Sequence, residues 1–293
     1  MIWIVYALLS AMFSTVSTIF RKKTIEKEHS ITFLTANKLF QLVALLVILP
    51  FINFYLSLAT YSIIAIIAVL SIESDIFWTK ALKRLNISIA TPLTNLSPAI
   101  IVILAYFILG EKITFLQLIG VILIVFGAYV LEADHGLTNT KQFLLKLKKS
   151  KYSILLFLSL IIGGFSAIGE RYMLGNKFID PMNLLFFSYL FTTILVLTFQ
   201  LNDDKNLIKV KQTIKRSKFP LIVTAIAGLL NTAFYYLAIK TAYISLVMPI
   251  LLTSTLLTTI IGGELFKENN ILYKSVACLI MLLGVFLIIG ISI

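Results

Sequence analysis

Two carboxylic acids, Glu73 and Asp75, lie near the middle of an apolar stretch that covers residues 61–82. A carboxylate at that depth in a membrane costs about 2.5 to 3.5 kcal/mol, so it must be protonated, paired with a cation or exposed to water. Successive helical residues turn by about 100°, which places the two acids on nearly opposite faces of a helix. They are therefore not a paired acid, and Glu73 is our first candidate for a substrate or proton pathway.

Polar groups on other apolar stretches could complete such a site. Lys38 lies about a turn and a half into the second stretch and is the candidate cationic partner of Glu73. Phe77 and Lys80 follow Glu73 at helical spacing and share its face. Asparagines in membrane helices can also serve only to join helices by hydrogen bonds. Further candidates for substrate binding or a proton pathway are Asn37, Asn95, Asn231, Trp78 and Tyr235.

Residues for covalent or metal chemistry are scarce in this chain. Cys278 is the single cysteine, and the two histidines, His29 and His135, lie in polar connections far apart in the sequence. We find no G-x-x-x-x-G-K-[ST] phosphate loop, Asp-rich motif or Ser/His pairing. The sequence therefore predicts no catalytic residue, no metal site and no cofactor, which argues against an enzyme.

Composition indicates an integral membrane protein. Hydrophobic residues make up 59% of the chain and charged residues 13%, with a mean hydropathy of +1.01. A net charge of +12 would suggest a nucleic-acid partner in a soluble protein. In a membrane protein it is better explained by lysines and arginines collected at one membrane face, so we expect the lipid bilayer and no nucleic acid as a partner.

One stretch of the chain is repeated. Residues 81–131 align without a gap on residues 238–288, at a constant offset of 157 positions. Each copy is long and apolar enough for two membrane spans, so the repeat indicates a duplicated membrane unit. The matching anchors are Ala81 with Ala238, Lys83 with Lys240, Ser88 with Ser245, Pro92 with Pro249, Glu111 with Glu268 and Gly127 with Gly284.

The predicted fold is an all-α membrane protein of ten transmembrane helices arranged as two inverted five-helix repeats. Residues 1–135 form the first repeat, 136–151 a basic linker and 152–293 the second repeat. Because five is an odd number, two copies in series enter the membrane with opposite orientations. The expected spans are residues 2–20, 31–52, 61–82, 89–109, 114–131, 154–174, 181–201, 219–239, 244–262 and 271–290.

Positive charge is distributed unevenly between the two ends of these spans. Residues 53–60 carry no charge, whereas the corresponding connection, 202–218, carries six lysines and arginines. Over all connections, about 20 basic residues fall on the side of the Arg21 connection and about 4 on the side of the termini, and such residues collect on the cytoplasmic side. We therefore predict a plasma-membrane protein with both termini outside the cytoplasm.

The corner between the fourth and fifth spans, LGEKITFLQLIGVILIVFG at residues 109–127, joins a proline-containing span to a glycine-containing one. With two five-span halves, this pattern resembles the EamA-type members of the drug/metabolite transporter superfamily over nearly the whole chain. The resemblance implies a cavity between the halves. The second copy departs from the pattern where Lys267 replaces Gly110 and Thr255 replaces Pro98. Members of the family are often described with cytoplasmic termini, whereas the charges here indicate the reverse.

Two further acids have predicted roles at span ends. Glu111 is expected to accept backbone N–H bonds from the start of the next helix or to pair with Lys112, rather than to bind substrate. Glu170, beside Arg171 at the end of the sixth span, is either a residue at the mouth of the pathway or an ordinary interfacial charge.

These observations predict a secondary transporter for a small metabolite such as an amino acid or an organic cation. Access would alternate between two inverted repeats, and coupling to protons is left open. The alternatives are a passive channel or a non-transporting membrane receptor, and less favoured is a membrane-embedded enzyme. The sequence does not indicate an oligomeric state.

Overall fold

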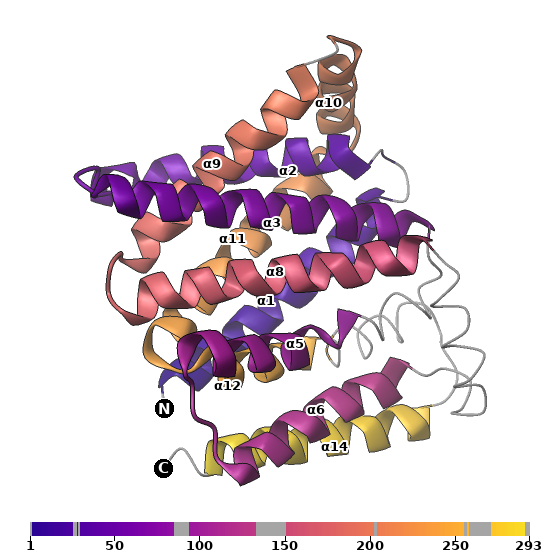
Figure 1. Ribbon diagram of the computed structural model, residues 1–293. Coiled ribbons are helices and arrows are strands. Elements are labelled where there is room, and N and C mark those ends of the chain that lie inside the picture. The colour runs from indigo at the N-terminus through magenta and orange to yellow at the C-terminus, as the bar shows by residue number, and fades with distance from the viewer. Residues whose placement is uncertain are drawn as a thin grey trace.

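The computed structural model describes residues 2–25, 28, 30–84, 94–132, 151–201, 204–254, 257 and 271–290. All regular elements within these residues are helices (Figure 1). The predicted linker lies outside the described residues except at Lys151. The helices are α1 (Ile2–Ile25), α2 (Ser30–Leu45), η1 (Leu46–Phe51), α3 (Leu58–Arg84), α5 (Ser97–Leu104), η2 (Ala105–Leu109), α6 (Phe115–Glu132), α8 (Lys151–Gly175), α9 (Pro181–Leu201), α10 (Asp204–Arg216), α11 (Lys218–Thr241), α12 (Ile244–Leu251) and α14 (Ile271–Gly290).

Six of the described helical segments are long and apolar enough to cross a membrane. Shorter apolar helices cover Ser97–Leu109 and Phe115–Gly127. Large apolar side chains such as Val47, Phe107 and Phe286 are exposed, as expected for a surface that faces lipid. The chain is thus an all-α, multi-pass integral membrane protein. The six segments are Ile2–Arg21, Ile31–Phe51, Leu58–Ala81, Lys151–Gly175, Pro181–Thr198 and Lys218–Thr241.

Helices of the first half pack mainly against helices of the second half. The principal pairs are α1 with α11, α3 with α8, and α6 with α14. We match α1, α2, α3, α5 and α6 in order with α8, α9, α11, α12 and α14. This matching turns the α1–α11 pair into the α8–α3 pair and leaves the α6–α14 pair unchanged. The same holds for α2–α11 with α3–α9 and for α1–α12 with α5–α8. The start of α1 and the end of α14 lie at the same end of the bundle (Figure 1).

Small residues allow the close packing of α8 against α3. A Cβ atom added to Gly163 would lie 2.8 Å from Ser74 Oγ, and one added to Gly169 would lie 2.9 Å from a side-chain carbon of Ile67. Between them, the hydroxyls of Ser166 and Ser71 are hydrogen-bonded at 2.7 Å. Small and hydroxyl-bearing residues commonly bring membrane helices together in this way. The α3–α8 contact fixes the acids of α3 relative to the second half.

Helix α10 is amphipathic and lies at one end of the bundle (Figure 1). Its Val210 packs with Phe33 and Leu221 in a small apolar cluster. The Thr213 hydroxyl donates a 2.6 Å hydrogen bond to Glu28 Oε2, just beyond the end of α1. Lys209, Lys211 and Lys215 of α10 are exposed, as in helices that lie along a membrane surface. The end of the bundle at which α1 ends and α2 and α11 begin, beside α10, is called the α10 side below. The end at which α8 ends and α12 begins is called the corner side.

Candidate functional site

An ion pair between α2 and α3 links to the second half of the chain. Lys38 Nζ lies 3.8 Å from Asp75 Oδ2 and 4.7 Å from the centre of the Tyr189 ring on α9. The Tyr189 hydroxyl is hydrogen-bonded at 2.9 Å to Thr232 Oγ1 on α11. Lys38, Asp75, Tyr189 and Thr232 are called the central cluster. It joins two helices of each half at polar groups inside otherwise apolar spans.

A second carboxyl group faces the same region from α8. Glu170 accepts a 3.0 Å hydrogen bond from the Tyr236 hydroxyl of α11. The Tyr235 ring lies 5.6 Å from the ring of Tyr236. Glu170, Asp75 and Arg21 are all close enough to Lys38 for their charges to act on it. Two cations and two carboxyl groups are thus grouped between the halves, and of the two sequence-based roles for Glu170, this position favours a pathway residue.

Arg21 approaches this group from the end of α1. Its guanidinium carbon lies 4.5 Å from the centre of the Trp78 ring and its Nη2 donates a 3.3 Å hydrogen bond to Thr79 Oγ1. A cation over an aromatic face gains about 0.5 to 2 kcal/mol. Arg21 Nε is buried and has no hydrogen-bond partner among the described residues. The guanidinium therefore keeps one donor for another group.

Two polar atoms near the central cluster are buried without a hydrogen-bond partner in the described part of the chain. They are Asn37 Oδ1 and Gln41 Oε1. Asn37 and Gln41 are one helical turn apart on α2, and Asn37 precedes Lys38. Leaving such an atom unpaired costs about 1 to 3 kcal/mol, so a group of them favours a site that a polar ligand completes.

Glu73 lies outside this group. Its side chain is exposed and lines a cavity of about 610 Å³ between α2, α3, α9 and α10. The predicted Lys38–Glu73 pair is corrected, because Lys38 pairs with Asp75. Asp75 shares its face of α3 with Trp78 and Thr79, which meet Arg21 of α1. Glu73 shares the other face with Phe77 and Lys80, as the helical spacing predicts.

The two remaining candidates, Asn231 and Asn95, have different surroundings. The Ser10 hydroxyl of α1 lies 2.7 Å from Asn231 Oδ1 and 3.0 Å from the Asn231 carbonyl oxygen. This contact joins α1 to α11, which is the helix-joining role considered for the asparagines. Asn95 is buried just before α5, away from the residues of the central cluster in sequence.

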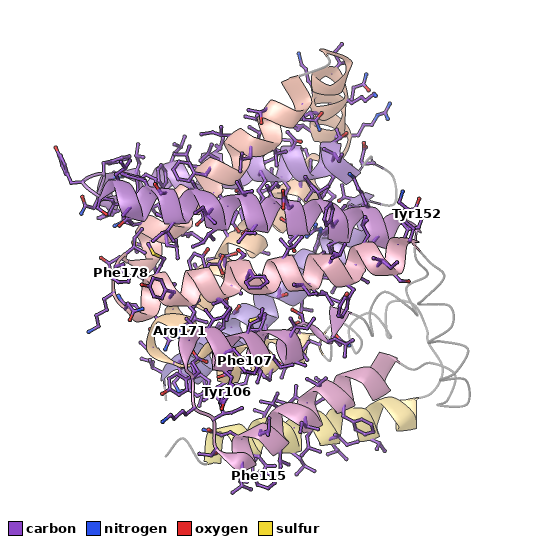
Figure 2. The ribbon with its side chains drawn as sticks, viewed as in Figure 1. Tyr106, Phe107, Phe115, Tyr152, Arg171 and Phe178 are labelled. Atoms are coloured by element: carbon purple, nitrogen blue, oxygen red, sulfur yellow. The ribbon has the colours of Figure 1, made fainter. Side chains whose placement is uncertain are left out.

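A buried contact between Arg171 and Glu111 closes the corner side. Arg171, at the end of α8 (Figure 2), donates from Nε to Glu111 Oε1 at 3.2 Å and from Nη1 to the carbonyl of Ile239. Glu111 also accepts the backbone N–H groups of Ile244 at 3.0 Å and Ser245 at 3.1 Å. The Ser245 hydroxyl donates to Glu111 Oε2 at 2.6 Å. We call these contacts the corner lock.

Glu111 reaches this position because the chain turns at Gly110. Gly110 has a positive φ of 65°, a conformation that glycine adopts without steric cost. The residue before α12, Tyr243, supplies no side-chain cap, so the Glu111 carboxylate caps α12 instead. Glu111 accepts helix N–H groups and belongs to the corner, but the prediction named the wrong helix and the wrong cation, because the carboxylate pairs with Arg171. The helix is α12 of the other half rather than the one that follows Glu111.

Sequence reasoning missed four polar residues of this region: Gln41, Ser188, Tyr189 and Thr232. Each is one of several polar residues scattered along an apolar span, a signal that the chain shares with many helix-joining hydroxyls. Their importance becomes visible only when α2, α9 and α11 are brought together.

Comparison with known proteins gives a family match over both halves. The sequence profile of the EamA-like transporter family matches residues 1–132 and 150–290. An uncharacterised protein from Methanocaldococcus jannaschii is 33% identical over 135 residues, which cover 45% of this chain and 97% of that protein. A solved structure titled "Crystal structure of protein" superposes with a TM-score of 0.71 at 14% identity, over 99% of this chain and 97% of the other. That likeness shows a shared fold.

Proposed function

Because the chain belongs to the EamA-like transporter family, we propose that it is a secondary carrier for a small metabolite such as an amino acid or an organic cation. Family membership makes it a membrane transporter of the drug/metabolite transporter superfamily. The observation that carries the finer proposal is the Lys38–Asp75 pair of the first half, with Tyr189 of the second half beside it. Charged groups inside membrane spans are costly and mark substrate or ion pathways.

The grouped charges fit a substrate that carries both signs or a positive charge alone. Asp75 and Glu170 can each bind an ammonium group, and the Tyr189 ring already lies against a cation. Lys38 and Arg21 can bind a carboxylate. The unpartnered Asn37 and Gln41 oxygens accept hydrogen bonds, which favours a ligand rich in N–H groups. An amino acid has this combination of groups.

Alternating access requires two halves that exchange roles. The helix pairs that map onto one another support two inverted five-helix repeats, 1–135 and 152–293, with ten transmembrane helices in all. The corner lock joins both halves on the corner side, so opening there requires Arg171, Glu111 and the start of α12 to separate. Opening on the α10 side would leave these contacts intact.

The charge distribution supports an orientation with the α10 side in the cytoplasm and both termini outside. We expect a cysteine at exposed Asn176 to react with an impermeant maleimide in intact cells, in a Cys278→Ala background. A cysteine at exposed Gln212 on α10 should react only after permeabilisation. Labelling of Gln212→Cys alone in intact cells would show the opposite orientation.

Transport itself is tested by uptake into proteoliposomes. A panel of amino acids and organic cations is supplied with and without an imposed proton gradient. We expect saturable uptake of at least one compound with an ammonium group, and accumulation above the external concentration if protons are coupled. Protein-free liposomes are the control. Unsaturable flux would favour a passive channel, and saturable binding without flux would favour a receptor.

A further inference from the structure

We propose that the cavity around Glu73 binds an aminophospholipid from the membrane leaflet on the α10 side. This cavity, called the lateral pocket, has a volume of about 610 Å³ and lies between α2, α3, α9 and α10. Helix α9 runs away from α3 toward α10 (Figure 1), and all three helices contribute residues to the lateral pocket.

The position of the pocket places it where lipid headgroups end and acyl chains begin. Lys80 is one residue from the end of the apolar segment Leu58–Ala81. Glu73 is about 10 Å deeper along α3, at a rise of 1.5 Å per residue. Lys209 comes from α10, whose amphipathic character fits the membrane surface. A ligand here would have its polar part near the surface and its apolar part in the bilayer.

Three charged side chains in the pocket are free to bind a headgroup. Glu73, Lys80 and Lys209 make no ion pair within the described part of the chain. Lysine ammonium groups bind phosphate as point charges. The Glu73 carboxylate of the same pocket binds a primary ammonium group and repels a second anion. An ethanolamine headgroup supplies a phosphate and a primary ammonium, a serine headgroup adds a carboxylate to these, and a glycerol headgroup supplies only the phosphate.

The walls of the pocket fit an acyl chain rather than a small soluble zwitterion. The apolar lining consists of Ile31, Leu34, Ile76, Phe77 and Val196. Apolar contact of this kind stabilises bound hydrocarbon by about 0.8 kcal/mol for each buried CH₂ group, a contribution that a free headgroup lacks. The apolar and polar linings together therefore indicate an amphiphile.

The lateral pocket and the central cluster can be tested independently. Glu73 and Asp75 lie on opposite faces of α3, and no residue of the central cluster lines the pocket. Lipid binding is measured on purified protein without any transported substrate. A failure to bind lipid would leave the carrier proposal intact. A failure to transport would likewise leave the lipid site intact.

The test is native mass spectrometry of the purified protein in mixed micelles with equal amounts of phosphatidylethanolamine and phosphatidylglycerol. We expect retained phosphatidylethanolamine to exceed phosphatidylglycerol by about fivefold, the ratio expected for one extra charge contact at a membrane surface. Glu73→Gln should bring this ratio to about one, because it removes the ammonium partner. The double variant Lys80→Ala, Lys209→Ala should reduce retention of both lipids.

Exposed residues outside the pocket provide matched controls. Lys211→Ala on α10 and Asp180→Asn on the corner side should leave the lipid ratio unchanged, and Glu73→Asp should retain the preference. Glu73, Lys80 and Lys209 are exposed, so their replacement removes no buried contact. An unchanged ratio in Glu73→Gln would overturn the proposal. Displacement of the lipid by soluble phosphoethanolamine would overturn a lipid as the ligand.

Discussion

Replacing Glu111 with alanine is expected to lower the stability of the folded protein by about 3 to 5 kcal/mol, the cost of breaking a buried charge pair by removing one partner. The change leaves the Arg171 guanidinium without its carboxylate. It also leaves the N–H groups of Ile244 and Ser245 without their acceptor at the start of α12. We expect a lower thermal unfolding temperature in detergent and reduced yield from membranes.

A second ion pair on the corner side is the matched control. Lys240 and Asp180 lie 3.1 Å apart, but the Asp180 side chain is 75% exposed. Exposed pairs contribute about 0 to 1 kcal/mol, so Asp180→Asn should change the unfolding temperature little. Glu111→Gln keeps one acceptor and should fall between the two. Equal unfolding temperatures for Glu111→Ala and wild type would show that the corner lock does not hold α12.

Replacing Asp75 with asparagine is expected to reduce transport about tenfold or more, because a lost charge-assisted contact costs about 1.5 to 3 kcal/mol. The change keeps the size of the side chain but removes the negative charge beside Lys38. Lys38 then lacks its carboxylate, and a substrate ammonium group lacks one of its binding groups. Initial rates of uptake in proteoliposomes, with the first compound found to be transported, measure this loss.

Glu73→Gln is the matched control for Asp75→Asn on the same helix. Glu73 lines the lateral pocket on the opposite face of α3, so we expect uptake within about twofold of wild type, the effect of an exposed charge. The sequence alone favoured Glu73 as the pathway residue, and the structure reverses the expected order of the two effects. Wild-type uptake by Asp75→Asn together with loss of uptake in Glu73→Gln would show that Glu73, and not Asp75, is the pathway residue.

The reversal shows what the sequence can predict for α3. Helical geometry correctly separates Glu73 from Asp75, since that angle depends only on the two positions. It does not indicate which face points inward. That choice depends on Arg21 of α1 and Lys38 of α2, and those helices meet α3 through contacts with no local signal in the sequence.

The extent of the apolar helices was predictable for a similar reason. Spans predicted at 2–20, 61–82 and 154–174 correspond to parts of α1, α3 and α8, because burial in lipid requires long apolar runs. The cap on α12 was not predictable. Glu111 lies 133 residues before Ile244, and only the tertiary fold brings them together.

The pairing of α1 with α11 also has consequences for synthesis. During translation, α1 enters the bilayer long before residues 218–241 exist, which at 5 to 20 residues per second is a delay of roughly 10 to 40 seconds. Until then the Ser10 hydroxyl lacks its acceptor, Asn231. The delay is shorter for α3, because its partner α8 is synthesised sooner after it. The nascent first half is therefore an incomplete bundle, and a ribosome that stalls before residue 218 leaves α1 exposed to membrane quality control.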